Sequence, residues 1–163
     1  MSLFGKSKPG RDDVYKGLRL QILQGSRKKF GLPPGVSRHE PWGVVMDWGM
    51  ARGTAIVTAL SDGSASIYLS SGGGSIGGGQ SHESIPVAAK NAVTIAAKLQ
   101  PTMRATTRYP LPTQDQLIFY VLTDAGAFTE SASVKDVSGH HHALSAVGDA
   151  IQAIITEYRQ TQK

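Results

Sequence analysis

The sequence predicts an α+β domain, with an antiparallel sheet of five to six strands and the element order α-βββ-α-βββ-α. Short segments of alternating or fully apolar residues are joined by glycine-containing turns, which is typical of strands in hairpins. Three longer segments repeat apolar residues at spacings of three and four, as amphipathic helices do. The 163 residues are enough for one domain with its own hydrophobic core.

The first predicted helix spans residues 12–24 and begins with two aspartates, which suit the positive end of a helix dipole. Val14, Leu18 and Ile22 fall four residues apart and form one stripe on it. Residues 26–41 contain three prolines and are predicted to connect this helix to the sheet.

Three strands are predicted to follow as a meander, at residues 42–50, 54–60 and 65–70. The first strand alternates, with Trp42, Val44, Met46 and Trp48 on one face and Gly43, Val45, Asp47 and Gly49 on the other. Asp47 therefore lies between small residues, which leaves room for another group to approach its carboxylate, although an ordinary hydrogen-bonded carboxylate fits equally.

The second half of the chain is predicted to contain a middle helix at 84–100 and a strand at 102–109. Strands at 117–123 and 127–134 follow, and the first of these is apolar on both faces, as a central strand is. The last predicted helix covers residues 143–160 and carries the clearest helical stripe in the chain.

The positive charge is concentrated at the N-terminal end of the sequence. The formal net charge is +5, and residues 1–38 alone hold nine basic and two acidic side chains, or +7. We therefore divide the chain into a basic arm at 1–41 and a single α+β domain at 42–163. Such an arm attracts polyanions regardless of sequence, so nucleic-acid binding through 1–38 is one hypothesis. A solvated segment that aids solubility is the other interpretation.

The composition excludes several classes of protein. The absence of cysteine excludes a disulfide framework, a thiolate zinc site and a thiol nucleophile. No apolar run approaches the about 18 residues of a membrane span, and the N-terminal residues lack the apolar core of a secretory signal. We expect a cytoplasmic protein that binds no cofactor.

The glycine-rich segment at residues 70–81 is the most unusual part of the sequence. It matches G-x-G-x-x-G between a predicted strand and a predicted helix, where glycines let backbone amides approach an anion. The surrounding strands form a meander rather than a parallel βαβ unit, and no Gly-Lys-Ser/Thr follows, so a dinucleotide or P-loop site is disfavoured. A mobile surface loop is the plain alternative. The candidate ligand-binding residues are Gly72, Gly73, Gly74, Ser75, Gly77, Gln80, His82 and Glu83.

The same segment contains a G-x-S-x-G match centred on Ser75, and Asp124 and the histidines at 140–142 follow in the chain order of a hydrolase triad. Three further glycines stand between Ser75 and the next helix, and a nucleophile needs a rigid turn. We therefore assign no catalytic residues.

The three consecutive histidines raise the question of a metal site. Neighbouring side chains on a helix point about 100° apart, so three of them do not converge on one ion. In an extended segment His140 and His142 share a side and supply two ligands, and His39, His82 or Asp136 would have to supply a third. A polar helix entry is the alternative.

The order of the predicted elements over residues 12–160 resembles that of the roadblock, longin and profilin-like group, in which a central sheet lies between a middle helix and terminal helices. It departs from the roadblock pattern, which has two strands rather than three before the middle helix. The resemblance implies a dimerising or partner-binding module rather than an enzyme.

The function predicted from the sequence is a non-enzymatic module that self-associates, as a homodimer, or binds a protein partner. Its candidate interface residues are Trp42, Trp48, Ile151 and Tyr158, although the two tryptophans are also suited to the core. The alternative is a small-ligand or nucleotide-binding domain that uses the glycine-rich segment 72–79.

Overall fold

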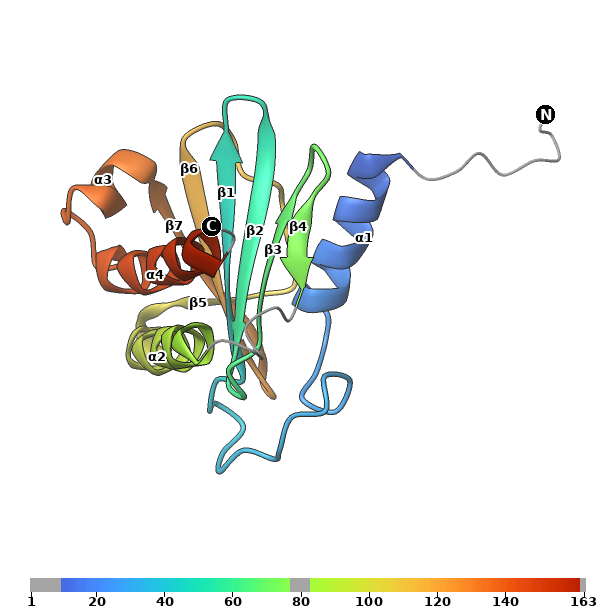
Figure 1. Cartoon of the computed structure of the whole chain (residues 1–163). Coiled ribbons are helices and arrows are strands. Elements are labelled where there is room, and N and C mark those ends of the chain that lie inside the picture. Colours follow the sequence, from blue (N-terminus) through green and yellow to red (C-terminus); the bar gives the residue numbers. More distant parts are fainter. Residues whose placement is uncertain (1–9, 77–82, 162–163) are drawn as a thin grey trace, which may run out of the picture.

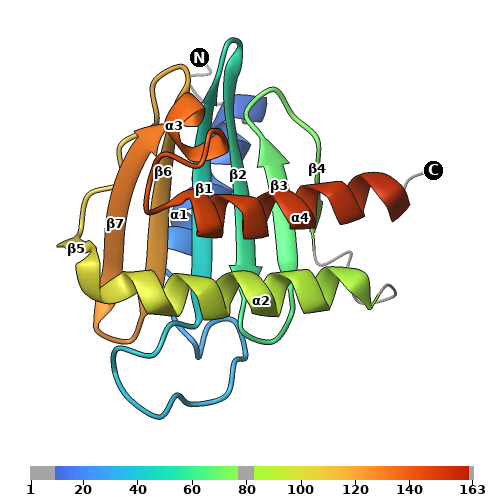
Figure 2. The same ribbon diagram turned by 90° about the vertical axis from the view of Figure 1, so that its left-hand side faces the viewer.

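A seven-stranded antiparallel sheet forms the centre of the molecule, and helices cover both of its faces (Figures 1 and 2). The computed structural model describes residues 10–76 and 83–161. Within them the strand order is β4-β3-β2-β1-β6-β7-β5. The strands are β1 Gly43–Met50, β2 Gly53–Leu60, β3 Ala65–Leu69, β4 Gly74–Ile76, β5 Arg104–Thr106, β6 Gln116–Thr123 and β7 Gly126–Ser133. The predicted α+β class is confirmed.

The described helices are α1 Arg11–Leu23, α2 Ser84–Leu99, α3 Val134–Ser138 and α4 Ser145–Thr161. Helix α1 lies on one face of the sheet, and α2 and α4 run side by side across the strands on the other (Figure 2). The molecule therefore has three layers, and each face of the sheet carries its own hydrophobic core.

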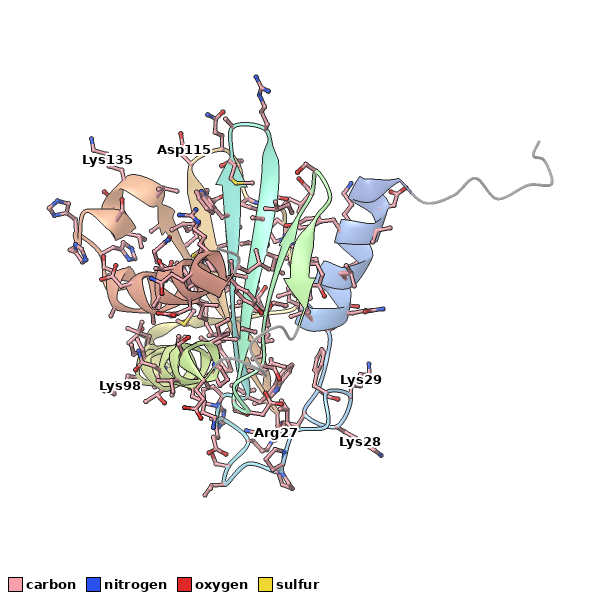
Figure 3. The ribbon with its side chains drawn as sticks, viewed as in Figure 1. Arg27, Lys28, Lys29, Lys98, Asp115 and Lys135 are labelled. Atoms are coloured by element: carbon pink, nitrogen blue, oxygen red, sulfur yellow. The ribbon has the colours of Figure 1, made fainter. Side chains whose placement is uncertain are left out.

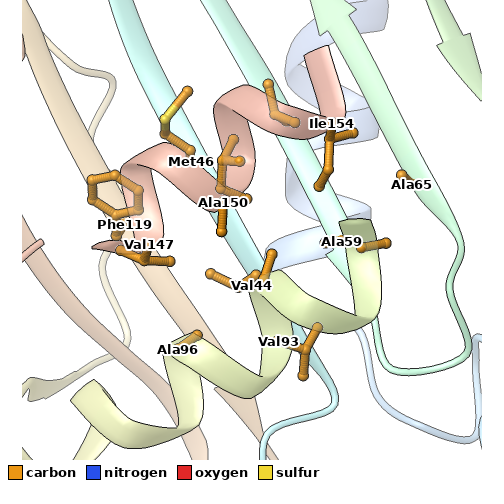
Figure 4. Close-up of a cluster of buried hydrophobic side chains, with 14 of the residues drawn as sticks. Val44, Met46, Ala59, Ala65, Val93, Ala96, Phe119, Val147, Ala150 and Ile154 are labelled. Carbon is orange, nitrogen blue, oxygen red and sulfur yellow. The ribbon is translucent and has the colours of Figure 1, made fainter. Parts of the chain in front are cut away.

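The larger core lies between the sheet and the α2–α4 pair (Figure 4). Small side chains on α2 allow the helix to approach β1 and β2 closely, and Ala89, Ala92 and Ala96 are buried there. On α4, Ile151 and Ile154 are fully enclosed, and the Tyr158 hydroxyl donates a hydrogen bond to the Ala65 carbonyl at 2.9 Å. Both predicted stripes thus face the sheet.

The second core lies beneath α1, and the chain before residue 42 contributes to it. Tyr15, Ile22, Leu23 and Leu32 pack with side chains from β1, β2 and β6. The segment predicted to be a separate arm is therefore part of the folded domain at these positions. The buried face of α1 also begins one residue later than predicted: Val14 is 51% exposed, whereas the next residue, Tyr15, is buried.

Strand β1 shows the predicted alternation. Val44, Met46 and Trp48 face the core of α2 and α4, whereas Val45 faces the core beneath α1. Trp42 precedes the strand and belongs to the core beneath α1 rather than to the Met46 face.

Three differences from the predicted elements occur at the ends of the sheet. The glycine-rich segment contributes β4, which pairs with β3 and adds an edge strand. The strand predicted at 102–109 is limited to Arg104–Thr106, because the next residues leave the sheet and cross toward α1. Helix α3 follows β7 directly, and the Ser133 side chain caps it by accepting from the Asp136 amide at 3.0 Å.

Gly49 marks a close crossing of two segments. A Cβ atom at this position would overlap the backbone carbonyl of Thr113, because the chain before β6 passes over β1 there. The Asp115 amide donates to the Gly49 carbonyl at 2.8 Å and holds this crossing in place. Only glycine fits without a shift of one of the two backbones.

We expect Gly49→Ala to lower the free energy of unfolding by about 1–3 kcal/mol, the usual cost of overpacking. Gly17→Ala is the matched control: nothing lies within 4 Å of its added methyl, and alanine favours a helix by up to about 1 kcal/mol over glycine. Urea denaturation of both variants provides the measurement. Equal stabilities would contradict the crossing as described.

Candidate binding site

A buried ion pair fixes α1 to the sheet. Arg19 occupies the middle of the inward face of α1, and Asp47 lies on β1 directly beneath it. The Arg19 Nε and Nη2 atoms both donate to Asp47 Oδ2, at 2.9 and 2.6 Å. The side chains are 4% and 0% exposed. The group that approaches Asp47 is thus a guanidinium from the same chain.

The same guanidinium holds the segment after β5. Its Nη1 donates to the Tyr109 carbonyl at 2.9 Å, and its Nη2 donates to the Pro110 carbonyl at 3.1 Å. One side chain thereby joins α1, β1 and the connection between β5 and β6. The Tyr109 ring also packs on Tyr120, with ring centroids 5.6 Å apart.

Burial and the contacts between these groups shift the pKa values of Arg19, Asp47 and Tyr120. Burial raises the pKa of Asp47, and the hydrogen bonds from Arg19 oppose the rise. Burial by itself lowers the pKa of Arg19, but the hydrogen bonds and charge of Asp47 outweigh it and raise that pKa. Burial, with the nearby Asp47 charge, raises the pKa of Tyr120 to about 12.

Some polar atoms of the cluster lack partners. Asp47 Oδ1 and the Tyr120 hydroxyl are buried and make no hydrogen bond to the described residues. A phenol donates and a carboxylate accepts, so the two atoms are chemically complementary although they are not joined. The ion pair joins α1 to β1 and leaves these two buried atoms with unused hydrogen-bonding capacity.

A second arginine anchors the loop after α1. Arg27 donates to the Glu40 carbonyl at 2.7 Å and pairs with the Asp124 carboxylate at 3.2 Å. Lys28 and Lys29, by contrast, point away from the sheet (Figure 3). Arg19 and Arg27 therefore face internal partners, which removes two of the nine basic side chains counted in 1–38 from any polyanion surface.

Beside the Arg19–Asp47 ion pair, a hollow of about 260 Å³ opens between α1 and strands β2 and β3. Its walls are mainly apolar and include Leu18, Ile22, Phe30 and Leu60. None of its ten lining residues is charged. We refer to it as the α1 hollow.

Thr58 distinguishes the α1 hollow from an ordinary packing gap. Its side chain is 3% exposed and lies on the α1 face of β2, between Ile56 and Leu60. Its Oγ1 has no hydrogen-bond partner among the described residues. Ser66, its cross-strand neighbour on β3, also lines the hollow. A buried hydroxyl without a partner costs free energy, so this position suits an occupant with a polar group.

The hollow continues along β3 toward the glycine-rich segment. A second hollow of about 300 Å³ shares Leu18 and Tyr68 with the first and ends at Gly72 and Gly73. These two glycines form the β3–β4 turn with φ angles of 100° and 91°, a backbone region that favours glycine. The turn geometry by itself accounts for both glycines.

Three of the other predicted ligand residues lie within the part of the chain that the structure describes. Gly74 and Ser75 belong to edge strand β4, and Glu83 immediately precedes α2. Gly77, Gln80 and His82 lie outside the described residues. Gly72 and Gly73 of the predicted set line the second hollow. The ligand role of the set stays a prediction.

The histidines of the predicted metal alternative have separate partners. His140 Nε2 lies 2.8 Å from Asp149 Oδ2, and His142 Nδ1 accepts the Leu144 amide at 3.0 Å near the start of α4. In residues 10–76 and 83–161, no group of three His, Asp or Glu side chains could hold a metal ion. Asp124, the acid of the triad pattern, pairs with Arg27.

The predicted interface residues lie in the interior of the single chain. Trp42, Ile151 and Tyr158 are 2%, 0% and 5% exposed, and Trp48 is partly buried against the larger core. Their apolar surface is used within the chain, as the core interpretation of the tryptophans expected. Self-association stays a prediction, and these side chains are not surface anchors for it.

Sequence reasoning did not identify Arg19 or Thr58 as residues of interest. Arg19 left a signal, since it lies four residues from both Tyr15 and Leu23, on one face of a helix where a buried charge needs a partner. Thr58 left none, because threonine is ordinary in a strand.

Comparisons with protein-family models, with curated proteins and with solved structures found no match to this chain. None of the helices in the described part of the chain is both long enough and apolar enough to cross a membrane.

We expect Arg19→Met to lower the free energy of unfolding by about 3–5 kcal/mol, because it leaves the Asp47 carboxylate buried and unpaired. The double variant Arg19→Met/Asp47→Leu should lose less than Arg19→Met alone, since no charge is left buried. Lys98→Met, at an exposed position, is the control and should change little. Chemical denaturation measures all three, and a double variant that loses as much stability as Arg19→Met, or more, would contradict a coupled pair.

The raised pKa of Tyr120 gives a pH dependence. Its ordinary value is 10.0 and its folded value is about 12, so the unfolded chain loses this proton first as the pH rises. The contribution to stability is complete below pH 10 and is lost as the pH rises toward 12. Tyr120→Phe should therefore flatten the stability profile in this window. Identical profiles for both proteins would show that Tyr120 ionises at its ordinary value.

Proposed function

We propose that this chain is a non-catalytic binding module that holds a small, uncharged and mainly apolar molecule in the α1 hollow. The observation that carries the proposal is the unpartnered Thr58 hydroxyl in a mainly apolar hollow of about 260 Å³. Apolar walls with one or two placed polar groups are typical of small-molecule sites.

The lining residues define the chemistry of the occupant. The absence of charge among them disfavours an ion, whose desolvation would not be compensated. The hydroxyls of Thr58 and Ser66 can donate and accept, so a mainly apolar molecule with one hydroxyl or N–H group suits both the walls of the hollow and these polar groups. The volume is below the about 300–1,000 Å³ of sites for drug-sized ligands, so the occupant is smaller than those.

Binding rather than catalysis is supported by what faces the hollow. Hydroxyls are the only nucleophilic groups among its lining side chains, and no histidine or carboxylate lines it to act as a base. The hollow replaces the glycine-rich segment as the centre of the small-ligand hypothesis, and it continues toward Gly72 and Gly73 of that segment.

We expect Thr58→Val to raise the free energy of unfolding of the ligand-free protein by about 1 kcal/mol. Valine has nearly the same shape and removes a buried hydroxyl that has no partner. A loss of stability of similar size would show that the hydroxyl is satisfied, and the argument for an occupant would fail.

Binding is tested by titrating the isotopically labelled full chain with indole, phenol and 1-hexanol, each of which joins an apolar body to one polar group. Saturable shifts should appear at the amides around Leu18, Thr58 and Ser66. Ser66→Leu, which fills the hollow, should abolish them, and Val87→Ser, an exposed position on α2, should leave them unchanged. Absence of saturable shifts with all three probes would overturn the proposal.

A further inference from the structure

The part of the sheet that α1 leaves uncovered contains a further hollow of different chemistry, which we call the β5–β7 hollow. It measures about 240 Å³ and lies over β5, β6 and β7, on the same face as α1. The register pairs Ile118 with Ser131, Tyr120 with Thr129, and Thr129 with Arg104, so these side chains share that face. Its residues are distinct from those of the α1 hollow.

This hollow is rich in free hydrogen-bond donors. The guanidinium groups of Arg104 and Arg108, the Gln116 amide NH₂ and the Ser131 hydroxyl make no hydrogen bond or ion pair within the described part of the chain. Arg104 lies on β5 and Arg108 on the segment that follows it, so two charges reach the hollow from different places.

Several acceptors around these donors already accept hydrogen bonds from other groups of the chain. Gln116 Oε1 accepts from the Thr113 amide at 2.9 Å, and the backbone amide and carbonyl of Arg108 both bond to the Thr106 hydroxyl at 3.0 Å. The Thr129 hydroxyl donates to the Phe119 carbonyl at 2.9 Å. These acceptors are therefore not available to the guanidinium groups of Arg104 and Arg108.

One carboxylate, that of Glu130, is among the residues that line the hollow. Glu130 is paired in register with Phe119, whose side chain is buried on the α2–α4 face, and its own Oε1 accepts the Ser131 amide at 3.1 Å. With two positive charges, Arg104 and Arg108, against one negative charge, Glu130, the formal charge of the lining residues is +1.

We propose that this hollow binds the phosphate group of a small soluble molecule. Guanidinium groups match phosphate oxygens in bidentate geometry, and an acceptor-rich anion uses the remaining amide and hydroxyl donors. The buried rings and methyls of Tyr120 and Ile118 give the organic part of a phosphate ester an apolar floor. A phosphate is favoured over a carboxylate, since two guanidinium groups, an amide and a hydroxyl together carry more N–H and O–H donors than the about four lone-pair sites of a carboxylate can accept.

The first test is a titration of the labelled full chain with glycerol 3-phosphate and with inorganic phosphate at low ionic strength. Saturable shifts should centre on residues 104–108, 116–120 and 129–131 and include the Nε–H signals of Arg104 and Arg108. Shifts that never saturate, or that spread over all basic residues, would show general charge attraction and overturn the proposal.

Variants identify the groups responsible. Arg104→Gln/Arg108→Gln should weaken binding at least tenfold, and Arg104→Lys/Arg108→Lys, which keeps the charge, should weaken it several-fold because the bidentate geometry is lost. Arg52→Gln and Lys90→Gln are matched controls at exposed positions elsewhere and should bind as the original chain does. Equal affinity in the lysine variant would contradict specific recognition.

Two further measurements complete the test. Ser131→Ala leaves the charge unchanged and should weaken binding, which supports the site even if an arginine variant folds poorly. Co-sedimentation with vesicles containing phosphatidic acid gives the other source of a phosphate group. Binding to vesicles without binding to either soluble probe would overturn the assignment to a soluble ligand.

Discussion

The ion pair between Arg19 and Asp47 is the constraint on which the α1 side of the molecule depends. Two charges removed from water are costly unless their geometry is good and their remaining donors are satisfied. Arg19 meets this condition with two bonds to one carboxylate oxygen and two to backbone carbonyls. Sliding α1 along the sheet would leave the Asp47 charge unpaired, so the pair specifies a single position for the helix.

That position determines where the face of the sheet stays open. With α1 fixed over β1, an apolar hollow forms between the helix and β2–β3, and a donor-rich one forms over β5–β7. The same guanidinium fixes the segment after β5 through the Tyr109 and Pro110 carbonyls, and Pro110 also lines the donor-rich hollow over β5–β7. One side chain therefore shapes the surroundings of both proposed sites.

Most of the sheet could be predicted because its residues obey simple periodicities. The alternation through Val44, Val45 and Met46 assigns β1 to two cores, and the spacing of Ile151, Ile154 and Tyr158 defines the buried face of α4. Strand β4 could not be predicted, since its pairing with β3 depends on a turn made of glycines that carry no periodic signal. The length of β5 was also beyond prediction, because its end is decided by the distant Arg19.

The candidate sites were much less accessible from the sequence than the fold. Both hollows depend on which strands become neighbours, and the order β6-β7-β5 is what brings Gln116 and Ser131 near Arg104. The glycine-rich segment drew attention by its composition, yet Gly72 and Gly73 are explained by their positive φ angles. The glycines are needed for the backbone conformation of the turn, whereas the unpartnered hydroxyl belongs to Thr58, a residue that is ordinary in a strand.

The two edges of the sheet are three residues long each, β4 on one side and β5 on the other. A row of unpaired backbone groups on an exposed edge is a template for recruiting strands from other molecules. Here each template is too short to align a long foreign strand, and the eight-residue strands β1, β2 and β6 each lie between two neighbours. The architecture thus protects these three apolar strands from strand addition, and on the β7 side it confines the open edge to the mainly polar residues beyond Thr129.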